Sequence, residues 1–299
     1  MKILISGASG LVGTHLIPTL AAKGHEIYKL VRKTPKSADE IQWDASTGFS
    51  DAEQAKLENF DAVVHLAGDN VASENWSKEK KQRIRESRAV GTRVLVDALK
   101  KTANPPKIFI SASASGFYGD RKDEILTEES PKGAGFLPDV CDEWEIEARK
   151  AADFGARVVS PRIGVVLSKD GGALDKMLTP FKLGVGGVVG SGKQFMPWIA
   201  LDDLIGVIHF ALERDDLKGA VNTVSPNPAT NEEFTKTLGK VISRPTILPI
   251  PEFAIKLLFG EMGETLLLQG QRMQPKRLED AGFKFKYPNL EDALKHAIN

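Results

Sequence analysis

The sequence predicts an α/β protein with a doubly wound parallel sheet and a smaller C-terminal lobe. Short β-rich runs alternate with helical stretches through the first half of the chain, and this alternation is typical of a parallel sheet. The strands read as nearly continuous apolar runs, which indicates that helices cover both faces of the sheet. Right-handed crossovers between the strands would place the helices there. The second half of the chain is richer in glycine and proline, which predicts the separate lobe.

Five strands are predicted in the first half, each between amphipathic or capped segments. They cover residues 3–6, 26–31, 62–66, 108–111 and 157–159. In the second half we expect a strand at 219–224, a helix capped by Asn231 with Glu232 and Glu233 in its first turn, and a last helix at 290–298.

These elements divide the chain into two predicted parts. The sheet domain covers residues 1–170 and is rejoined by the chain at about 197–225. The smaller lobe covers residues 171–299, where loops and short elements should dominate.

Composition and charge exclude several classes of protein. The 299 residues carry 40 basic and 40 acidic side chains, so there is no basic excess for binding a nucleic-acid backbone. No apolar run approaches the roughly 20 residues of a membrane helix, and Met1 and Lys2 lead into a strand instead of a signal peptide. With Cys141 as the only cysteine, an internal disulfide and a multi-thiolate metal site are excluded. We expect a cytoplasmic protein without a metal, a nucleic-acid partner or a membrane partner.

Three glycines between the first strand and the first helix predict a phosphate-binding turn. Gly7 permits a tight turn, Gly10 lets the backbone approach a pyrophosphate, and Gly13 lets the helix pack closely on the sheet. The free N–H groups at the start of the helix would then face the phosphates. The spacing differs by one residue from the G-x-G-x-x-G form, and the alternative is a glycine-rich turn that binds nothing.

The residues after the second strand indicate which dinucleotide would bind. An acidic residue there binds the ribose 2′-hydroxyl of NAD, whereas an arginine accommodates the 2′-phosphate of NADP. This strand is followed by Arg32 and Lys33, and a guanidinium matches phosphate geometry with two parallel hydrogen bonds. The sequence therefore favours NADP, and the alternative is a solvated basic pair at the end of a strand.

Several motifs together resemble the short-chain dehydrogenase/reductase superfamily in its extended, epimerase/dehydratase-like part. The resemblance covers essentially the whole chain and rests on the glycine turn and on residues 63–68, 88–92, 111–119, 161–167, 190–194 and 201–204. Arg88 stands where this superfamily usually has Asn. Residues 141–145, 196–199, 260–262 and 270–272 resemble more narrowly a branch described as "epimerase family protein", which ends in a domain of unknown function, here about 249–297.

The resemblance implies an NADP-binding Rossmann domain on which a small lobe, residues 171–299, closes as the substrate lobe. It implies cofactor contacts, besides the glycine turn, at Arg32, Lys33, Leu66, Ala67, Arg88 and Val166. The local sequence also supports a phosphate contact for Arg88, independently of the resemblance. Arg88 lies in a basic segment that we interpret as a helix start, and the guanidinium groups of this segment could reach phosphate. The alternative for Arg88 is a solvated helical face.

The expected catalytic pair of the superfamily is absent. Where the resemblance implies a Tyr and, one helical turn later, a Lys, this chain has Cys141 and Glu145. A neighbouring carboxylate raises the pKa of a thiol, so Cys141 should stay protonated. Cys141 also lies in an apolar helical stripe, which favours a core role over a catalytic one. Tyr118 and Lys122 have the Tyr-x-x-x-Lys spacing in a predicted loop, where we interpret it as a coincidence.

Ser113 and Tyr118 remain the candidate catalytic residues, because loops after parallel strands converge on the cofactor crevice. Ser113 could bind a substrate oxygen and Tyr118 could supply a proton; a turn hydroxyl and a packed aromatic ring are the alternatives. The leading hypothesis is an NADP-dependent oxidoreductase or epimerase-like enzyme that acts on a small molecule. The alternatives are an NADP-binding sensor or interaction protein without turnover, and a scaffold with a vestigial groove.

Overall fold

A parallel sheet forms the centre of the molecule. The computed structural model describes residues 1–298, and the largest sheet has the strand order β12-β8-β5-β4-β1-β2-β3, with β6 beside β8. All of these strands pair in parallel. Their bounds are β1 (Lys2–Ser6), β2 (Glu26–Val31), β3 (Glu40–Gln42), β4 (Ala62–His65), β5 (Ile108–Ser111), β6 (Ser113–Ala114), β8 (Arg157–Ile163) and β12 (Gly219–Thr223). The predicted doubly wound parallel sheet is confirmed.

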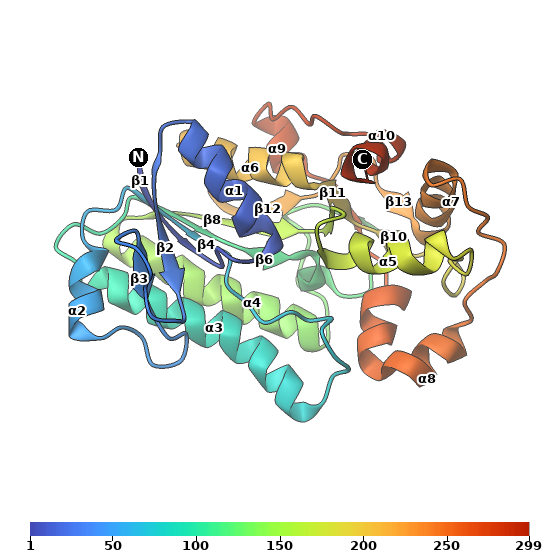
Figure 1. The fold of residues 1–299 in the computed structure, drawn as a ribbon, viewed down its shortest axis with the longest axis horizontal. Coiled ribbons are helices and arrows are strands. Elements are labelled where there is room, and N and C mark those ends of the chain that lie inside the picture. The colour runs from blue at the N-terminus through green and yellow to red at the C-terminus, as the bar shows by residue number, and fades with distance from the viewer. Residues whose placement is uncertain (299) are drawn as a thin grey trace.

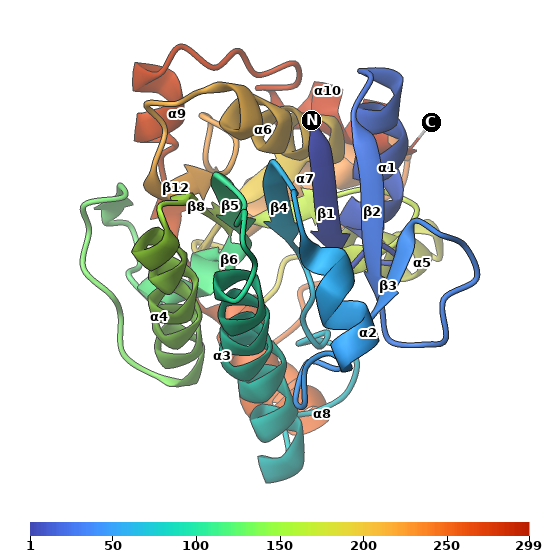
Figure 2. The same cartoon turned by 90° about the vertical axis from the view of Figure 1, so that its left-hand side faces the viewer.

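Helices cover both faces of this sheet, as Figures 1 and 2 show. α1 (Leu11–Ala22) and α6 (Leu201–Glu213) lie on one face, and α3 (Lys78–Lys100) and α4 (Phe136–Arg149) lie on the other. Alternate residues of a strand point to opposite faces, so Ile3 packs under α1 and α6, whereas Leu4 packs under α3. Burial on both faces explains the continuous apolar runs of the strands.

A smaller lobe lies beside the carboxyl ends of the strands, on the right of Figure 1. It has its own core, in which Leu174, Phe181, Phe234 and Leu294 are buried around Trp198. Its elements are α5 (Gly172–Lys182), β10 (Phe195–Met196), β13 (Ala229–Thr230), α7 (Asn231–Val241), α8 (Glu252–Gly263), a π-helical turn (Glu264–Leu268) and α10 (Leu290–Ile298).

Several short elements connect the lobe with the sheet. β11 (Trp198–Ala200) pairs with β9 (Val165–Leu167), and β14 (Arg272–Met273) pairs with β7 (Ile125–Leu126). The remaining elements are α2 (Asp51–Gln54), α9 (Lys276–Asp280) and the 3₁₀ turns Ala55–Leu57, Ser115–Tyr118 and Lys150–Phe154. The chain therefore passes between the two parts more than once.

Two predicted helix starts are wrong. The cap of α7 is Thr230, whose hydroxyl accepts from the Glu233 N–H while the Glu233 carboxylate accepts from the Thr230 N–H. This capping box makes Asn231 the first residue of the helix and not its cap. The segment before Arg88 is the interior of α3, which begins at Lys78 after the cap Ser77.

Candidate functional site

The glycine turn brings three chain segments into close contact at the carboxyl end of β1. Gly7 has a φ of 71°, and a Cβ there would lie 2.8 Å from the carbonyl carbon of Leu66. A Cβ on Gly13 would lie 2.4 Å from the Gly7 carbonyl oxygen. Gly10 precedes α1 without a side-chain cap, so the first N–H groups of the helix stay available for an anion. These features fit the pyrophosphate of a dinucleotide.

Ser6 links this turn to the one after β4. Its hydroxyl accepts from the N–H groups of Leu66 (3.1 Å) and Ala67 (3.2 Å), and lies 2.6 Å from His65 Nδ1. The hydroxyl hydrogen therefore points to Nδ1, which leaves the ring hydrogen on Nε2. Nε2 is buried without a partner, and burial lowers the pKa of His65 to about 4. His65 is thus a structural residue that positions Leu66 and Ala67.

Arg32 and Lys33 follow β2 and are exposed. Among residues 1–298, no carboxylate forms an ion pair with either side chain, whereas other exposed cations such as Arg83, Lys236 and Lys295 are paired. Because β2 pairs with β1 in parallel, the two cations lie at the same edge of the sheet as the glycine turn. They are free to bind an anion beside that turn.

Arg88 reaches from α3 to the turn after β4. Its Nη1 donates to the carbonyl oxygens of Asp69 (3.0 Å) and Ile84 (3.2 Å), and its guanidinium lies 5.1 Å from the centre of the Trp144 ring. Burial lowers the pKa of Arg88. The alternative that Arg88 lies on a solvated face of the helix is therefore wrong. That its guanidinium binds a phosphate stays a prediction. Val166 lies in β9, and a Cβ on Gly172 would lie 3.9 Å from its carbonyl oxygen.

The hydroxyl of Ser113, the first candidate catalytic residue, donates a hydrogen bond to a carboxylate. Its Oγ donates to Glu145 Oε1 over 2.7 Å, and both side chains are buried. Glu145 also accepts two hydrogen bonds from Arg162, at 2.8 Å from Nε and 2.9 Å from Nη2. The Arg162 guanidinium lies 3.4 Å from the centre of the Phe117 ring. A charge-paired glutamate thus occupies the place where the superfamily has lysine.

Tyr118, the second candidate, lies inside the protein. Its side chain is fully buried, and its hydroxyl lies 2.7 Å from Asn222 Oδ1 and 3.0 Å from the Thr127 carbonyl oxygen. It accepts from Arg162 Nη1 over 2.8 Å, and burial raises its pKa. Lys122 is exposed with a φ of 53°, whereas the Tyr118 hydroxyl is bonded to Thr127, Asn222 and Arg162, which agrees with a coincidental spacing.

Cys141 is buried in α4 beside Arg88 and Glu145. Burial is the main cause that raises the pKa of its thiol to about 12; the Glu145 carboxylate adds to the effect and Arg88 opposes it. The predicted protonated thiol is confirmed, but its principal cause is burial and not the neighbouring carboxylate. The thiol packs in a cluster with Phe117 and Tyr118.

Sequence reasoning missed the Glu145–Arg162 pair. The sequence identifies Glu145 only as a departure from a motif, and Arg162 only as a member of the motif at residues 161–167. An arginine on a buried strand rarely lacks a charged partner. The position of Arg162 could therefore have indicated that an acidic residue such as Glu145 pairs with it.

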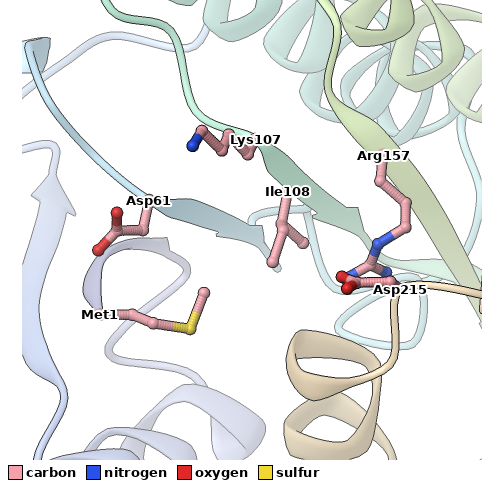
Figure 3. A pocket seen from close by; sticks show the side chains of 6 residues that line it. All are labelled: Met1, Asp61, Lys107, Ile108, Arg157 and Asp215. Carbon is pink, nitrogen blue, oxygen red and sulfur yellow. The ribbon is translucent and has the colours of Figure 1, made fainter.

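A pocket of about 420 Å³ lies at the opposite edge of the sheet (Figure 3). It is lined by residues before or at the starts of strands, among them Asp61, Lys107 and Arg157, with Arg157 pointing toward Asp215. This pocket is far from the glycine turn and is not part of the candidate site.

Within residues 1–298 no helix is long and apolar enough to cross a membrane, and no cluster of potential metal ligands occurs.

The sheet order, the glycine turn and the crossover helices define a Rossmann fold of the short-chain dehydrogenase/reductase epimerase type. Residues 3–224 match the NAD dependent epimerase/dehydratase family, and residues 250–297 match the domain of unknown function DUF1731. The chain belongs to this family and, within it, to the epimerase family proteins that resemble SDR39U1.

Individual relatives support this assignment. The crystal structure of human epimerase family protein SDR39U1 with NADPH has a TM-score of 0.90 and 35% identity, over 99% of both chains. An epimerase family protein of Mycobacterium bovis is 41% identical over 295 residues, which are 99% of this chain and 97% of the relative. A UDP-N-acetylglucosamine 4-epimerase from Bacillus cereus has a TM-score of 0.76 at 17% identity, over 99% of this chain and 98% of its own, and shares the fold.

Proposed function

We propose that this protein is an NADP-dependent oxidoreductase or epimerase-like enzyme that acts on a small molecule between the Rossmann domain and the C-terminal lobe. The observation that carries the proposal is the unpaired cation pair Arg32 and Lys33 beside the glycine turn. Two positive charges at that place fit the 2′-phosphate of NADP better than a bare ribose hydroxyl. The human relative crystallised with NADPH supports the same cofactor. The single buried cysteine supports a cytoplasmic location.

NADP would be held by Gly7, Gly10 and Gly13, by the Leu66–Ala67 turn, by Arg32, Lys33 and Arg88, and by Val166. When bound, it supplies hydride donor or acceptor chemistry at the nicotinamide ring. The side chains must then move one proton to or from the reacting oxygen of the substrate.

Ser113 and Glu145 can move that proton. Because the Ser113 hydrogen is given to Glu145, the free lone pairs of Oγ accept a hydrogen bond from a substrate hydroxyl. In the oxidative direction the substrate proton passes to Ser113 Oγ while the Ser113 proton passes to Glu145 Oε1. Tyr118 is a positioning residue, since its hydroxyl holds the Arg162 that pairs with Glu145.

The alternative is an NADP-binding sensor or interaction protein without turnover. Ser113, Tyr118 and Cys141 are 2%, 0% and 3% exposed, and this shielding favours the alternative. Cofactor binding is common to both hypotheses, and consumption of the cofactor separates them.

A fluorescence titration with NADPH and NADH tests the cofactor. Arg32→Ala should weaken NADPH about tenfold to a hundredfold, which corresponds to about 1.4–3 kcal/mol for lost charge-assisted hydrogen bonds, and should leave NADH unchanged. Lys218→Ala is the matched control, because it removes an exposed cation before β12, at the opposite edge of the sheet. Equal losses of NADPH and NADH, or equal effects of both variants, would contradict the NADP assignment.

A panel of small alcohols and carbonyl compounds, followed by NADPH absorbance, tests turnover. Ser113→Ala should abolish turnover with NADPH affinity intact. Turnover that survives this substitution removes Ser113 from the reaction, and NADPH binding without turnover of any compound favours the sensor.

A further inference from the structure

The C-terminal lobe exposes a group of large apolar side chains. They come from the chain after α5, from the chain before α8 and from α8 itself, and each is more than half exposed. Ile247 and Leu257 are the most exposed, at 84% and 81%. Single exposed apolar residues are ordinary, whereas a large group of them marks an interaction surface. We call this group the lobe patch; it consists of Leu183, Val185, Ile247, Leu248, Phe253 and Leu257.

Two segments that run side by side bring the first four residues of the lobe patch together. Val189 and Ile250 form a parallel bridge, and the Ile250 N–H donates to the Val188 carbonyl oxygen over 2.8 Å. Two residues earlier on each segment, Gly187 packs so closely on the Leu248 carbonyl group that a Cβ has no room. The exposed residues just before these contacts therefore lie at the same end of the pairing.

α8 continues this surface. The helix begins at Glu252, two residues after the bridge, and Figure 1 shows it at the lower right of the molecule. Phe253 and Leu257 are four residues apart, so they lie on the same side of the helix. Ile255 is buried on another side. The exposed side of α8 thus adds two large side chains to the patch.

Contacts with the sheet domain hold α8 in place. Asn75 Nδ2 donates to the Leu258 carbonyl oxygen over 3.0 Å, and Lys81 Nζ lies 2.6 Å from Glu261 Oε2. A surface that is already fixed loses less conformational freedom when a partner binds. The lobe patch is therefore organised before any partner is present.

The area of the lobe patch fits one side of a stable dimer interface. Its six residues together expose the equivalent of about four whole residues. At about 150–200 Å² for a large apolar residue, this is about 600–800 Å² of apolar surface. The largest apolar patch of an ordinary monomer is about 300–600 Å², and a standard interface buries about 800 Å² on each partner. No part of residues 1–298 covers the patch.

The charges near the lobe patch favour a second copy of this chain over a membrane. Residues 252–264 carry three glutamates and one lysine, whereas a helix that lies on an anionic membrane is rich in lysine and arginine. The chain has no net charge, so two copies do not repel each other at long range.

Two unpaired charges at the edge of the patch have opposite signs. Lys182 directly precedes Leu183, and Glu252 directly precedes Phe253; both are exposed, and neither forms an ion pair with another of residues 1–298. In a two-fold dimer, a contact between Lys182 of one protomer and Glu252 of its partner would occur twice. The edge of the patch is thus complementary to itself.

We propose that the lobe patch binds a second copy of this chain in a two-fold symmetric dimer. Phe253 and Leu257 lie in the apolar centre of the contact, and Lys182 and Glu252 lie at its polar rim. This inference is independent of the proposed function, because no residue of the lobe patch belongs to the candidate site.

Sedimentation velocity at protein concentrations up to about 100 µM tests the dimer, because interfaces of this size have dissociation constants of about 1 µM or below. Phe253→Glu and Leu257→Glu each place a charge in the centre of the patch. Ile146→Glu is the matched control, because Ile146 is a 42% exposed apolar residue of α4 outside the patch. We expect dimers of the unmodified protein and of Ile146→Glu. The other two variants should associate about a hundredfold more weakly, because a carboxylate buried without a partner is strongly unfavourable.

Thermal unfolding followed by circular dichroism shows whether the variants fold, and substitutions at such exposed positions should change it little. A monomer at about 100 µM, or a dimer that persists in either Phe253→Glu or Leu257→Glu, overturns the proposal. Flotation with vesicles of phosphatidylcholine and phosphatidylglycerol examines the membrane. Vesicle binding by a monomeric unmodified protein, lost in Leu257→Glu, would assign the patch to a membrane and overturn the dimer.

Discussion

Replacement of Arg162 by methionine should strongly destabilise the protein. Arg162 donates two hydrogen bonds to Glu145 and one to Tyr118, and it covers the Phe117 ring. Arg162 and Glu145 side chains are 5% and 3% exposed. Arg162→Met therefore leaves the buried Glu145 carboxylate with the exposed Arg149, whose Nη1 lies 3.8 Å from Oε2, in place of its bidentate partner. Breaking a buried pair in this way costs about 3–5 kcal/mol. That is a large part of the roughly 5–15 kcal/mol that stabilises a folded domain.

The double variant Arg162→Met with Glu145→Met tests the cause of this loss. With both charges removed, no unpaired charge stays buried, so the double variant should be less destabilised than the sum of the two single variants by about 2 kcal/mol or more. Urea unfolding, followed by tryptophan fluorescence and circular dichroism, measures these free energies where the two signals coincide. A loss below about 1 kcal/mol for Arg162→Met, or additive single variants, would refute the reasoning.

Two further predictions concern buried titratable groups. His65 has a folded pKa of about 4 against 6.5 when unfolded, so its contribution is present above pH 6.5 and is lost as the pH falls toward 4. Between pH 7 and pH 4 the unmodified protein should lose about 3 kcal/mol more unfolding free energy than His65→Gln, and equal losses in urea titrations would contradict the assignment. Cys141, buried with a thiol pKa of about 12, should react with iodoacetamide only in urea. Labelling of the folded protein within minutes would show that the thiol is accessible.

The strands whose bounds could be predicted from the sequence are those whose ends are determined by residues next to them in the chain. β2 and β5 have the predicted bounds. β5 is buried throughout and ends where its apolar run ends, and β2, in which only Leu30 is buried, ends where Arg32 and Lys33 follow. β8 continues to Ile163, beyond the predicted end at residue 159, through a proline and an arginine that local propensity disfavours in a strand. Pairing with β12 explains the difference, since Pro161 and Arg162 are in register with Val221 and Asn222.

The side-chain network around Ser113 could not be predicted in the same way. The partners of Tyr118 and Arg162 come from segments as distant as Asn222, and their register depends on the completed sheet. The cap of α7 was misplaced by one residue because Thr230 and Asn231 are both good caps, and only the reciprocal bond with Glu233 selects Thr230.

The position of β12 affects how the chain can be divided. β8 lies between β5 and β12, so a fragment that stops at residue 170 would present the main-chain N–H and C=O groups of β8 as an open edge. Val158 and Val159 in that strand are buried in the whole protein, and an unprotected apolar edge promotes self-association. Expression of residues 1–170 alone should therefore yield aggregates, while any soluble truncation has to retain the segment through residue 223 together with the helices that pack on it.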